Sequence, residues 1–288
     1  MIGAIVGDIA GSRFEFDNHK SKDFELFVSC EKLTGNADED LRKMLNSSAY
    51  SDDSVMTLAI AKALLLWKEM KLPTYQDLSR FAVESMREFG KMYPLAGYGG
   101  TFEVWLHDET MGPYNSWGNG AAMRVSACGW AGQTLDEVKA MSRAVTKVTH
   151  NHPEGIKGAE ATAVATFLAR TGKSKEKIKS VVVRDYYPLD FTRDEIRPYY
   201  EFDVSCQGSV PQAIEAFMES TSFEDAIRNA VSIGGDSDTI AAICGAVAGA
   251  FYGVPADIRA TAEVFLPHHL LETLHSFERE FVDTIGLI

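Results

Sequence analysis

The sequence predicts an all-α protein: a single-domain orthogonal helical bundle over residues 1–288, with a binuclear metal site at helix N-termini. Apolar residues recur at helical spacing through most of the long segments. Only VVVR, near residue 182, suggests a β-strand. Two helical segments are apolar nearly all round and begin with hydroxyl groups beside paired acids. These two segments predict both the centre of the bundle and the place of its site.

Six segments have clear helical periodicity, and turn signals lie between them. The helices are expected at 55–70, 135–148, 153–170, 222–233, 240–252 and 270–285. The turns are expected at Pro73 and at 97–100, 112–120 and 171–173. The helices over 55–66 and 240–252 should lie in the middle of the bundle, because nearly every side of them is apolar. In the second, Gly245 and Gly249 would let a neighbouring backbone approach closely.

The composition is that of a folded protein with a large core, at 288 residues and 45% hydrophobic content. Lys and Arg number 28 against 41 Asp and Glu, which gives a net charge of -13. This charge disfavours broad binding of nucleic acid or of an anionic membrane. An anionic ligand would therefore need a local source of positive charge or of hydrogen-bond donors.

The cysteines and the apolar segments indicate a cytoplasmic protein without a membrane anchor. The four cysteines are widely separated and form no CxxC pair, which favours reduced, structural thiols. Asp8 interrupts the first apolar run where a signal peptide would be continuous. The apolar run over 239–253 is shorter than the ~20 residues that a membrane span needs. A monomer is the expected state.

The acidic helix starts YSDDS (50–54) and GGDSDT (234–239) predict a metal site. Either one alone is more typical of a helix cap. If both starts met in the bundle, however, their carboxylates would repel one another unless divalent cations lay between them. Carboxylate and hydroxyl oxygens suit Mg²⁺, Mn²⁺ or Ca²⁺, and no Cys/His cluster favours zinc. Two ions are plausible for the candidate ligands Ser51, Asp52, Asp53, Asp236, Asp238 and Thr239.

A third acidic element, GDIAGSRFEF, lies near the N-terminus. Asp8 and Glu15 are seven residues apart, which is two turns of helix, and would share one face. Asp8 is costly to bury unpaired, so we expect it to meet a backbone donor or a cation. Glu15 lies between Phe14 and Phe16, and apolar surroundings would raise its pKa and suit it to acid/base chemistry. The alternative for Glu15 is an exposed acid.

Five motifs together resemble the ADP-ribosylglycohydrolase family, whose members include the hydrolase that reactivates dinitrogenase reductase and the ADP-ribosyl-acceptor hydrolases. The resemblance spans almost the whole chain, and any one of the motifs would be a weak signal. In order, the motifs are GDIAGSRFE (7–15), YSDDS (50–54), GNGAAMR (118–124), THNHPEGIKGA (149–159) and GGDSDTIA (234–241).

The resemblance implies an all-α bundle that holds two Mg²⁺ or Mn²⁺ ions and cleaves a bond at C1 of the distal ribose of an ADP-ribosylated protein or small molecule. It implies the six ligands named above, and catalysis by Glu15, Asp53 and Asp236. GNGAAMR would open a helix, so that Gly118, Asn119 and Gly120 present backbone N–H groups to a diphosphate. His150 would lie near the ribose and phosphates, and Tyr98 would line the acceptor side or stack on adenine.

The sequence leaves open both the acceptor to which ADP-ribose is linked and the type of reaction. Family members that act on ADP-ribosyl-arginine tend to carry an aspartate where this chain has Gly97, so arginine specificity is in doubt. Asp108 or Glu109 could substitute, or the acceptor could be serine, an acetyl ester or a nucleic-acid base. A two-metal phosphohydrolase that cleaves a nucleotide diphosphate is the rival enzyme. A binding or structural protein that has lost turnover is the rival outside enzymology.

Overall fold

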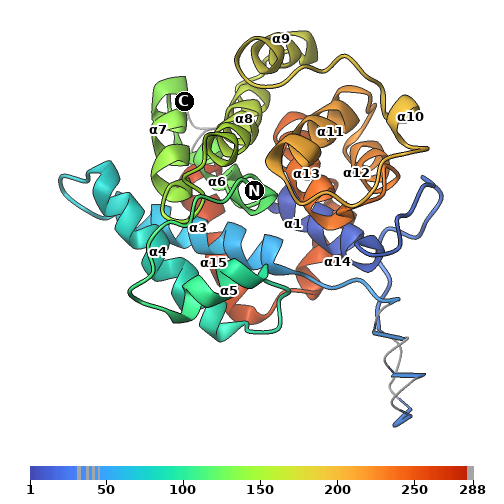
Figure 1. Cartoon of the computed structure of the whole chain (residues 1–288), viewed down its shortest axis with the longest axis horizontal. Coiled ribbons are helices and arrows are strands. Elements are labelled where there is room, and N and C mark those ends of the chain that lie inside the picture. Colours follow the sequence, from blue (N-terminus) through green and yellow to red (C-terminus); the bar gives the residue numbers. More distant parts are fainter. Residues whose placement is uncertain (31–33, 37–38, 41–42, 45, 284–288) are drawn as a thin grey trace.

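The computed structural model describes residues 1–30, 34–36, 39–40, 43–44 and 46–283, and its ordered elements are helices (Figure 1). No β-strand occurs in these ranges, where an isolated bridge joins Gly118 to Ser205. The all-α fold class is confirmed. In chain order the elements are α1 (Ile2–Gly11), η1 (Ser12–Phe14), α3 (Asp52–Lys68), α4 (Tyr75–Met92), α5 (Gly100–His107), η2 (Asn119–Ala121), α6 (Ser126–Ala131), α7 (Leu135–Thr146), α8 (Pro153–Arg170), α9 (Lys175–Asp185), α10 (Arg193–Ile196), α11 (Cys206–Met218), α12 (Phe223–Val231), α13 (Ser237–Tyr252), α14 (Ala256–Val264) and α15 (His268–Phe281).

The six helices predicted from periodicity are confirmed as α3, α7, α8, α12, α13 and α15. Helix α8 has the expected bounds of 153–170, and the bounds of the other five differ from the expected ones by a few residues at one or both ends. The expected end of the last helix, at 284–285, lies outside the described residues. Three of them begin at a Ser or Thr whose side-chain oxygen accepts a backbone N–H, which is Ser51 for α3, Thr134 for α7 and Ser222 for α12. Local capping therefore explains where these three helices start.

The possible strand at VVVR is wrong, because these residues belong to α9. Ile178, Val181 and Val182 are buried, whereas Val183 is exposed. Buried positions at spacings of three and four form one face of a helix, and a half-buried strand would alternate instead. Ser174 caps this helix by accepting a hydrogen bond from the backbone of Lys177 at 3.3 Å. A three-valine run was too short to reveal this pattern.

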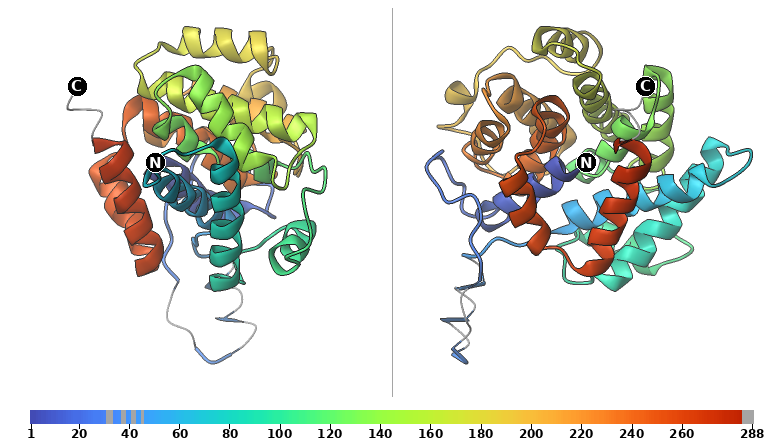
Figure 2. Two further views of the ribbon diagram at one scale, coloured as in Figure 1. Left: turned by 90° about the vertical axis from the view of Figure 1, so that its left-hand side faces the viewer. Right: turned by 180° about the vertical axis from the view of Figure 1, so that it is seen from behind.

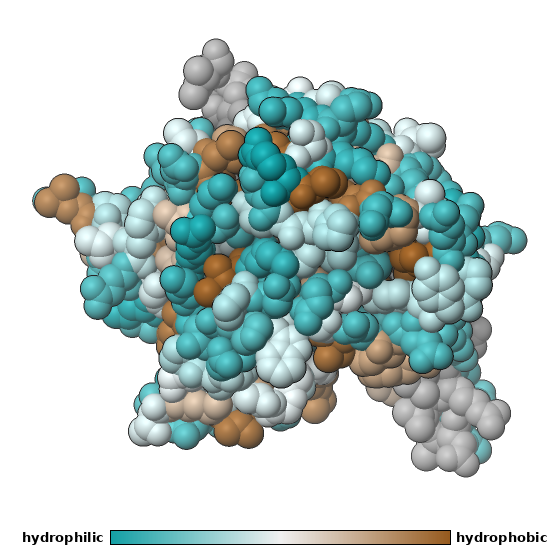
Figure 3. Space-filling model, turned by 45° about the horizontal axis from the view of Figure 1, so that its top comes forward, coloured by the Kyte–Doolittle hydropathy of each residue, from teal (hydrophilic) through white to brown (hydrophobic). Residues whose placement is uncertain are grey.

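Helix α13 lies inside the molecule, where α8, α11 and α12 pack against it on one side and α1 crosses it closely (Figures 1 and 2). Helices α3, α4 and α15 form a neighbouring group, in which α3 is central. The residues of α3 and α13 are buried over most of their length, as their apolar patterns predicted. None of the described helices combines the length and apolar character that a membrane span requires. The face shown in Figure 3 is mostly hydrophilic, with scattered apolar areas.

Glycines set the distance between α1 and α13. A Cβ atom on Gly3 would lie 2.3 Å from the carbonyl oxygen of Gly245, and one on Gly7 would lie 2.0 Å from that of Ala241. The close approach predicted for Gly245 and Gly249 is confirmed, because both meet the backbone of Gly3. The two helices run antiparallel, since later residues of α1 meet earlier residues of α13. The C-terminal end of α1 therefore reaches the acidic start of α13.

Candidate functional site

A cavity of about 420 Å³ lies where α3, α5 and α13 begin. Residues between α5 and α6, residues before α11, Glu15 after η1 and His150 before α8 complete its wall. The residues that line it are Glu15, Asp52, Asp53, Gly97, Gly99, Gly100, Thr101, Phe102, Tyr114, Ser116, Gly118, Asn119, Gly120, Met123, Arg124, His150, Phe202, Val204, Asp236, Asp238 and Thr239. Most of the site residues expected from the sequence thus share one cavity, while their individual functions stay predictions.

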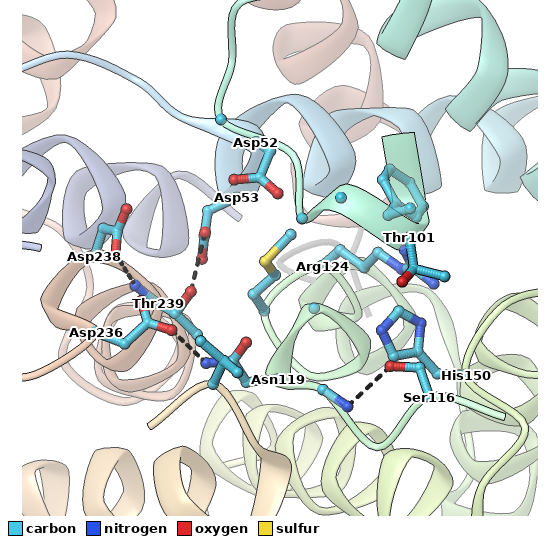
Figure 4. A pocket seen from close by; sticks show the side chains of 18 of the residues that line it. Asp52, Asp53, Thr101, Ser116, Asn119, Arg124, His150, Asp236, Asp238 and Thr239 are labelled. Carbon is cyan, nitrogen blue, oxygen red and sulfur yellow. Dashed lines mark hydrogen bonds between the residues drawn. The ribbon is translucent and has the colours of Figure 1, made fainter. Parts of the chain in front are cut away.

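The two acidic helix starts converge at one end of this cavity (Figure 4). A hydrogen bond joins them directly, because the hydroxyl of Thr239 donates to Oδ2 of Asp53 at 3.1 Å. Carboxylate oxygens of Asp8, Asp53 and Asp238 lie within 4.8 Å of one another, as do those of Glu15, Asp236 and Asp238. Asp238 belongs to both groups. This arrangement could hold two neighbouring cations.

Asp8 ties the end of α1 to the first turn of α3. Its side chain accepts hydrogen bonds from the backbone N–H groups of Ser51 and Ser54, each at 3.0 Å. The hydroxyl of Ser51 donates to Asp8 at 2.7 Å, and that of Ser54 donates as well. The backbone donor expected for Asp8 is confirmed. Ser51 caps α3 and does not line the cavity. Its hydroxyl, which the sequence predicted to be a metal ligand, donates its hydrogen bond to Asp8.

The acidic end carries more negative charge than its hydrogen bonds offset. Burial, followed by neighbouring carboxylates, raises the pKa values of Asp52, Asp53 and Asp238 well above their usual range. Oδ1 of Asp53 is buried and has no hydrogen-bond partner among the described residues. An orphaned carboxylate oxygen among like charges fits a hard divalent cation. The donor set is therefore suitable for Mg²⁺ or Mn²⁺.

Glu15 lies at the acidic end, although not on a helix shared with Asp8. Helix α1 stops at Gly11 and a 3-10 turn follows, so the expected two turns of one helix are wrong. Phe14 is buried but Phe16 is 82% exposed, so the expected apolar flank exists on one side only. Burial, then the charges of Asp236 and Asp8, raise the pKa of Glu15 to about 7. The raised pKa of Glu15 therefore has burial as its first cause and the neighbouring acids as its second.

The pKa of Glu15 predicts how pH acts on the metal-free protein. The folded state holds the proton of Glu15 up to about pH 7, whereas the unfolded chain loses it near the ordinary value of 4.5. Stability therefore falls as the pH rises through this window. Asp52, Asp53 and Asp238 add effects of the same sign, because their pKa values are also raised. Thermal denaturation after chelation should show a Tm that falls between about pH 5 and pH 8.

Added Mg²⁺ and one substitution test whether ionised carboxylates cause this fall in Tm. Mg²⁺ should raise the Tm much more at the upper end of the range than at the lower end, since cations offset only ionised carboxylates. Glu15→Gln should make the decline shallower below pH 7, because the variant lacks one of the titrating groups. A Tm that rises over the same range in the chelated protein would contradict the assigned pKa shifts.

The loop over 118–120 differs from the expected diphosphate cradle. GNGAAMR forms the 3-10 turn η2, and the next helix begins only at Ser126. The N–H of Asn119 donates to the carbonyl of Val204 at 2.8 Å, and that of Gly118 donates to Ser116 at 3.1 Å. Two of the three N–H groups assigned to the diphosphate are therefore used within the protein. The side chain of Asn119 instead donates to Oδ2 of Asp236 at 2.6 Å, which orients that carboxylate.

His150 lies beside this loop, on the cavity wall. Its Nδ1 lies 2.8 Å from the hydroxyl of Thr149, and a Cβ on Gly120 would lie 3.4 Å from its Nε2. Burial, and secondly the charge of Arg124, lower the pKa of His150 well below its usual range. The imidazole is thus neutral at pH 7 and can present a hydrogen-bonding nitrogen to a ligand.

Several expected acceptor-side residues lie elsewhere. The hydroxyl of Tyr98 donates to the carbonyl of Tyr93 at 3.1 Å, and Tyr98 does not line the cavity. Asp108 and Glu109 do not line it either, and Asp108 accepts hydrogen bonds from Thr110. Gly97 does line it, and a Cβ there would lie 3.9 Å from Oδ1 of Asp52. Neither Asp108 nor Glu109 therefore replaces the acid that is missing at Gly97.

Sequence reasoning missed several residues of the wall. Arg124, Tyr114, Thr101, Phe202 and Val204 were not singled out as ligand contacts. Arg124 could have been found, because it ends the GNGAAMR motif and is a cation in an apolar stretch. Phe202 and Val204 come from the irregular segment before α11, where no periodic pattern indicates which side chains face the cavity.

Comparisons with known proteins agree over nearly the whole chain. A model of the ADP-ribosylglycohydrolase family matches residues 1–284. The ADP-ribosylhydrolase ARH3 of Xenopus tropicalis is 27% identical, over 91% of this chain and 89% of that protein. The ADP-ribosylarginine hydrolase Tri1 of Pseudomonas putida is 25% identical, over 88% of this chain and 70% of that protein. A solved structure of an ADP-ribosylglycohydrolase-related protein complex has a similar fold, with a TM-score of 0.58 at 23% identity and 96% coverage of both chains.

Proposed function

The chain belongs to the ADP-ribosylglycohydrolase family, and from this premise we propose that it hydrolyses the bond at C1 of the distal ribose in an ADP-ribosylated protein side chain or small molecule. The product would be free ADP-ribose. The observation that supports this reaction is the convergence of Glu15, Asp52, Asp53, Asp236 and Asp238 at one end of a single cavity. The names of two relatives, an ADP-ribosylhydrolase and an ADP-ribosylarginine hydrolase, support the same substrate class.

Two Mg²⁺ or Mn²⁺ ions are the proposed cofactors. The candidate ligands are Asp52, Asp53, Asp236, Asp238 and Thr239. Asp8 shares one of the two carboxylate groups with Asp53 and Asp238, and the hydroxyl of Ser51 donates to it. The orphaned Oδ1 of Asp53 and the raised pKa values of the aspartates support this choice. Bound ions of this kind orient ribose hydroxyls and lower the pKa of water.

Residues of the chain would transfer the proton and hold the carboxylates in position. Loss of the acceptor develops oxocarbenium character at C1, which nearby carboxylates stabilise. Glu15 is the proposed proton donor and acceptor, because it lines the cavity beside these carboxylates and burial, followed by their charges, raises its pKa to about 7 in the metal-free protein. Asp236 is held by the amide of Asn119, and Asp53 by the hydroxyl of Thr239. These hydrogen bonds would keep both carboxylates in place during turnover.

The acceptor is proposed to be a neutral oxygen linkage, such as that of serine or an acetyl ester. A guanidinium acceptor needs a nearby carboxylate partner. Gly97 offers none, and neither Asp108 nor Glu109 lines the cavity. The carboxylates that do line it are the candidate metal ligands and the proposed proton donor Glu15, so none is left for a guanidinium. ADP-ribosyl-arginine should therefore be the poorest of these three substrates.

Turnover before and after metal removal tests the proposal. The chelated protein should release no ADP-ribose from ADP-ribosyl-serine, ADP-ribosyl-arginine or O-acetyl-ADP-ribose, and Mg²⁺ should restore release. Chromatography of the products identifies the broken bond. AMP in place of ADP-ribose would favour the two-metal phosphohydrolase, and binding of ADP-ribose without turnover of any substrate would favour a non-catalytic protein.

A further inference from the structure

An exposed pair of aromatic rings lies at the edge of the cavity. Phe16 is 82% exposed and Phe202 is 48% exposed, and their ring centres are 5.8 Å apart, at the spacing of stacked aromatic side chains. Phe202 also lines the cavity, as does Val204, which is 55% exposed. The cavity therefore reaches the surface at these residues. We call Phe16, Phe202 and Val204 the apolar rim; exposed apolar side chains that gather beside a cavity are typical of a binding surface.

The turn that presents Phe16 is fixed to the protein on two sides. Asn18 has a left-handed backbone, with φ at 46°, and its side-chain oxygen accepts the N–H of Gly235 at 3.0 Å. The ammonium group of Lys20 donates to the carbonyl of Tyr200 at 2.5 Å, which ties the turn to the segment that carries the second ring. A ring held on a fixed backbone loses little conformational entropy when a partner covers it.

The proposed reaction brings the acceptor next to this rim. The carboxylates lie at one end of the cavity and His150 lies at the other, so the distal ribose belongs at the carboxylate end (Figure 4). A proton donor has to lie within hydrogen-bond distance of the leaving oxygen. Because Glu15 is the proposed donor, the acceptor leaves the cavity beside Glu15. Phe16 follows Glu15 directly in the same turn.

We infer that the acceptor is a polypeptide, and that the apolar rim binds a large apolar side chain directly before or after its ADP-ribosylated residue. This inference rests on the proposed function, which places the acceptor at this end of the cavity. Consecutive Cα atoms of a polypeptide are 3.8 Å apart, so a neighbouring side chain reaches the rim while the modified one enters the cavity. Asp17 and Glu201 adjoin the two rings in the chain and are exposed. Their charges would repel an acidic neighbour in the acceptor.

Three peptides that carry ADP-ribosyl-serine test the rim in the chelated, full-length protein, where turnover does not interfere. They differ only at the two residues beside the serine, which are both Leu, both Ala or both Glu. Fluorescence anisotropy should show that the Leu peptide binds roughly fivefold more tightly than the Ala peptide, because the rim covers part of its apolar surface. The Glu peptide should bind more weakly than the Ala peptide, and added salt should reduce that difference.

Substitutions of Phe16 assign the preference to the rim. Phe16→Ala should remove most of the difference between the Leu and Ala peptides and leave the affinity for free ADP-ribose nearly unchanged, because Phe16 does not line the cavity. Phe16→Leu should keep most of the difference, since it retains an apolar side chain. Leu72→Ala is the matched control: Leu72 is 88% exposed between α3 and α4 and does not line the cavity. It should change none of these affinities.

Equal affinity of the Leu and Ala peptides for the unmodified protein would overturn the inference, and this comparison needs no variant to fold. A Phe16→Ala protein that keeps the full preference would overturn it as well. So would one that loses the peptides and free ADP-ribose equally, which would assign Phe16 to the ADP-ribose pocket. Failure of free ADP-ribose to bind would overturn the proposed function and the inference with it, whereas binding of ADP-ribose without a preference between the peptides overturns the inference alone.

Discussion

An Asp53→Asn variant is expected to lose turnover by about 100-fold or more and to bind divalent ions much more weakly, while it still folds. Asp53 belongs to the acidic start of α3 and accepts a hydrogen bond from Thr239 at the start of α13. Its Oδ1 is the one carboxylate oxygen of this group that is buried without a described partner. An amide of the same shape keeps the hydrogen bond from Thr239 but removes the charge that would hold a cation. Isothermal titration with Mn²⁺ and assays of ADP-ribose release measure the two losses.

The same variant separates a metal site from a structural cluster. Without metal, removal of one charge relieves repulsion from Asp8, Asp52 and Asp236, so the chelated variant should be at least as stable as the unmodified protein. With Mg²⁺, the unmodified protein should be the more stable of the two. Asp257→Asn, on the exposed first turn of α14, is the control and should change nothing. Undiminished metal affinity in Asp53→Asn would contradict the assigned site.

Local patterns predicted the elements well, because each of the six predicted helices carries its own periodicity, and α3, α7 and α12 also carry a Ser or Thr cap. The acidic starts of α3 and α13 were predictable for a further reason. Both helices are apolar nearly all round, which predicts a central place for each of them. That their starts meet was only a hypothesis, because α3 and α13 lie in neighbouring groups of helices and α1 connects the two starts through Asp8. The strand prediction at VVVR was wrong because three consecutive valines cannot distinguish the alternation of a strand from the helical spacing of Ile178, Val181 and Val182.

The residues that the sequence misplaced are those whose partners come from distant irregular segments. The N–H groups of Gly118 and Asn119 looked free in GNGAAMR, but Ser116 and Val204 accept them. Tyr98 looked free to face a ligand, but its hydroxyl turns back to Tyr93. Backbone groups and hydroxyls in loops satisfy one another wherever geometry allows. Such pairings depend on the tertiary structure and leave no periodic trace.

The role of Asp8 illustrates the same point at the site itself. Its burial was predictable from the apolar run around it, and so was its need for a donor. Its four hydrogen bonds to Ser51 and Ser54 depend on the position of α1 along the axis of α13. That position is set by glycines, which carry no side chain to reveal their partners. The packing of α1 on α13 therefore controls the acidic end of the cavity.

Gly7→Ala is expected to destabilise the protein by about 3 kcal/mol, at the upper end of ordinary overpacking effects. The added methyl carbon would lie 2.0 Å from the carbonyl oxygen of Ala241 and 2.3 Å from its carbon. These are backbone atoms of a buried helix, so no flexible side chain can move aside. Relief requires α1 and α13 to separate over their whole contact. Thermal denaturation should show a Tm lower by roughly 5–10 °C.

The separation should also damage the acidic end, because Asp8 follows Gly7 directly and holds the first turn of α3. Metal-dependent stabilisation should therefore shrink together with the Tm, even though no candidate ligand is changed. Gly112→Ala is the control: its added Cβ would meet nothing within 4 Å, and it should leave both quantities unaltered. A Gly7→Ala protein with the original Tm would mean that α1 and α13 are not held at this distance. A lower Tm with full metal-dependent stabilisation would mean that Asp8 holds α3 independently of that contact.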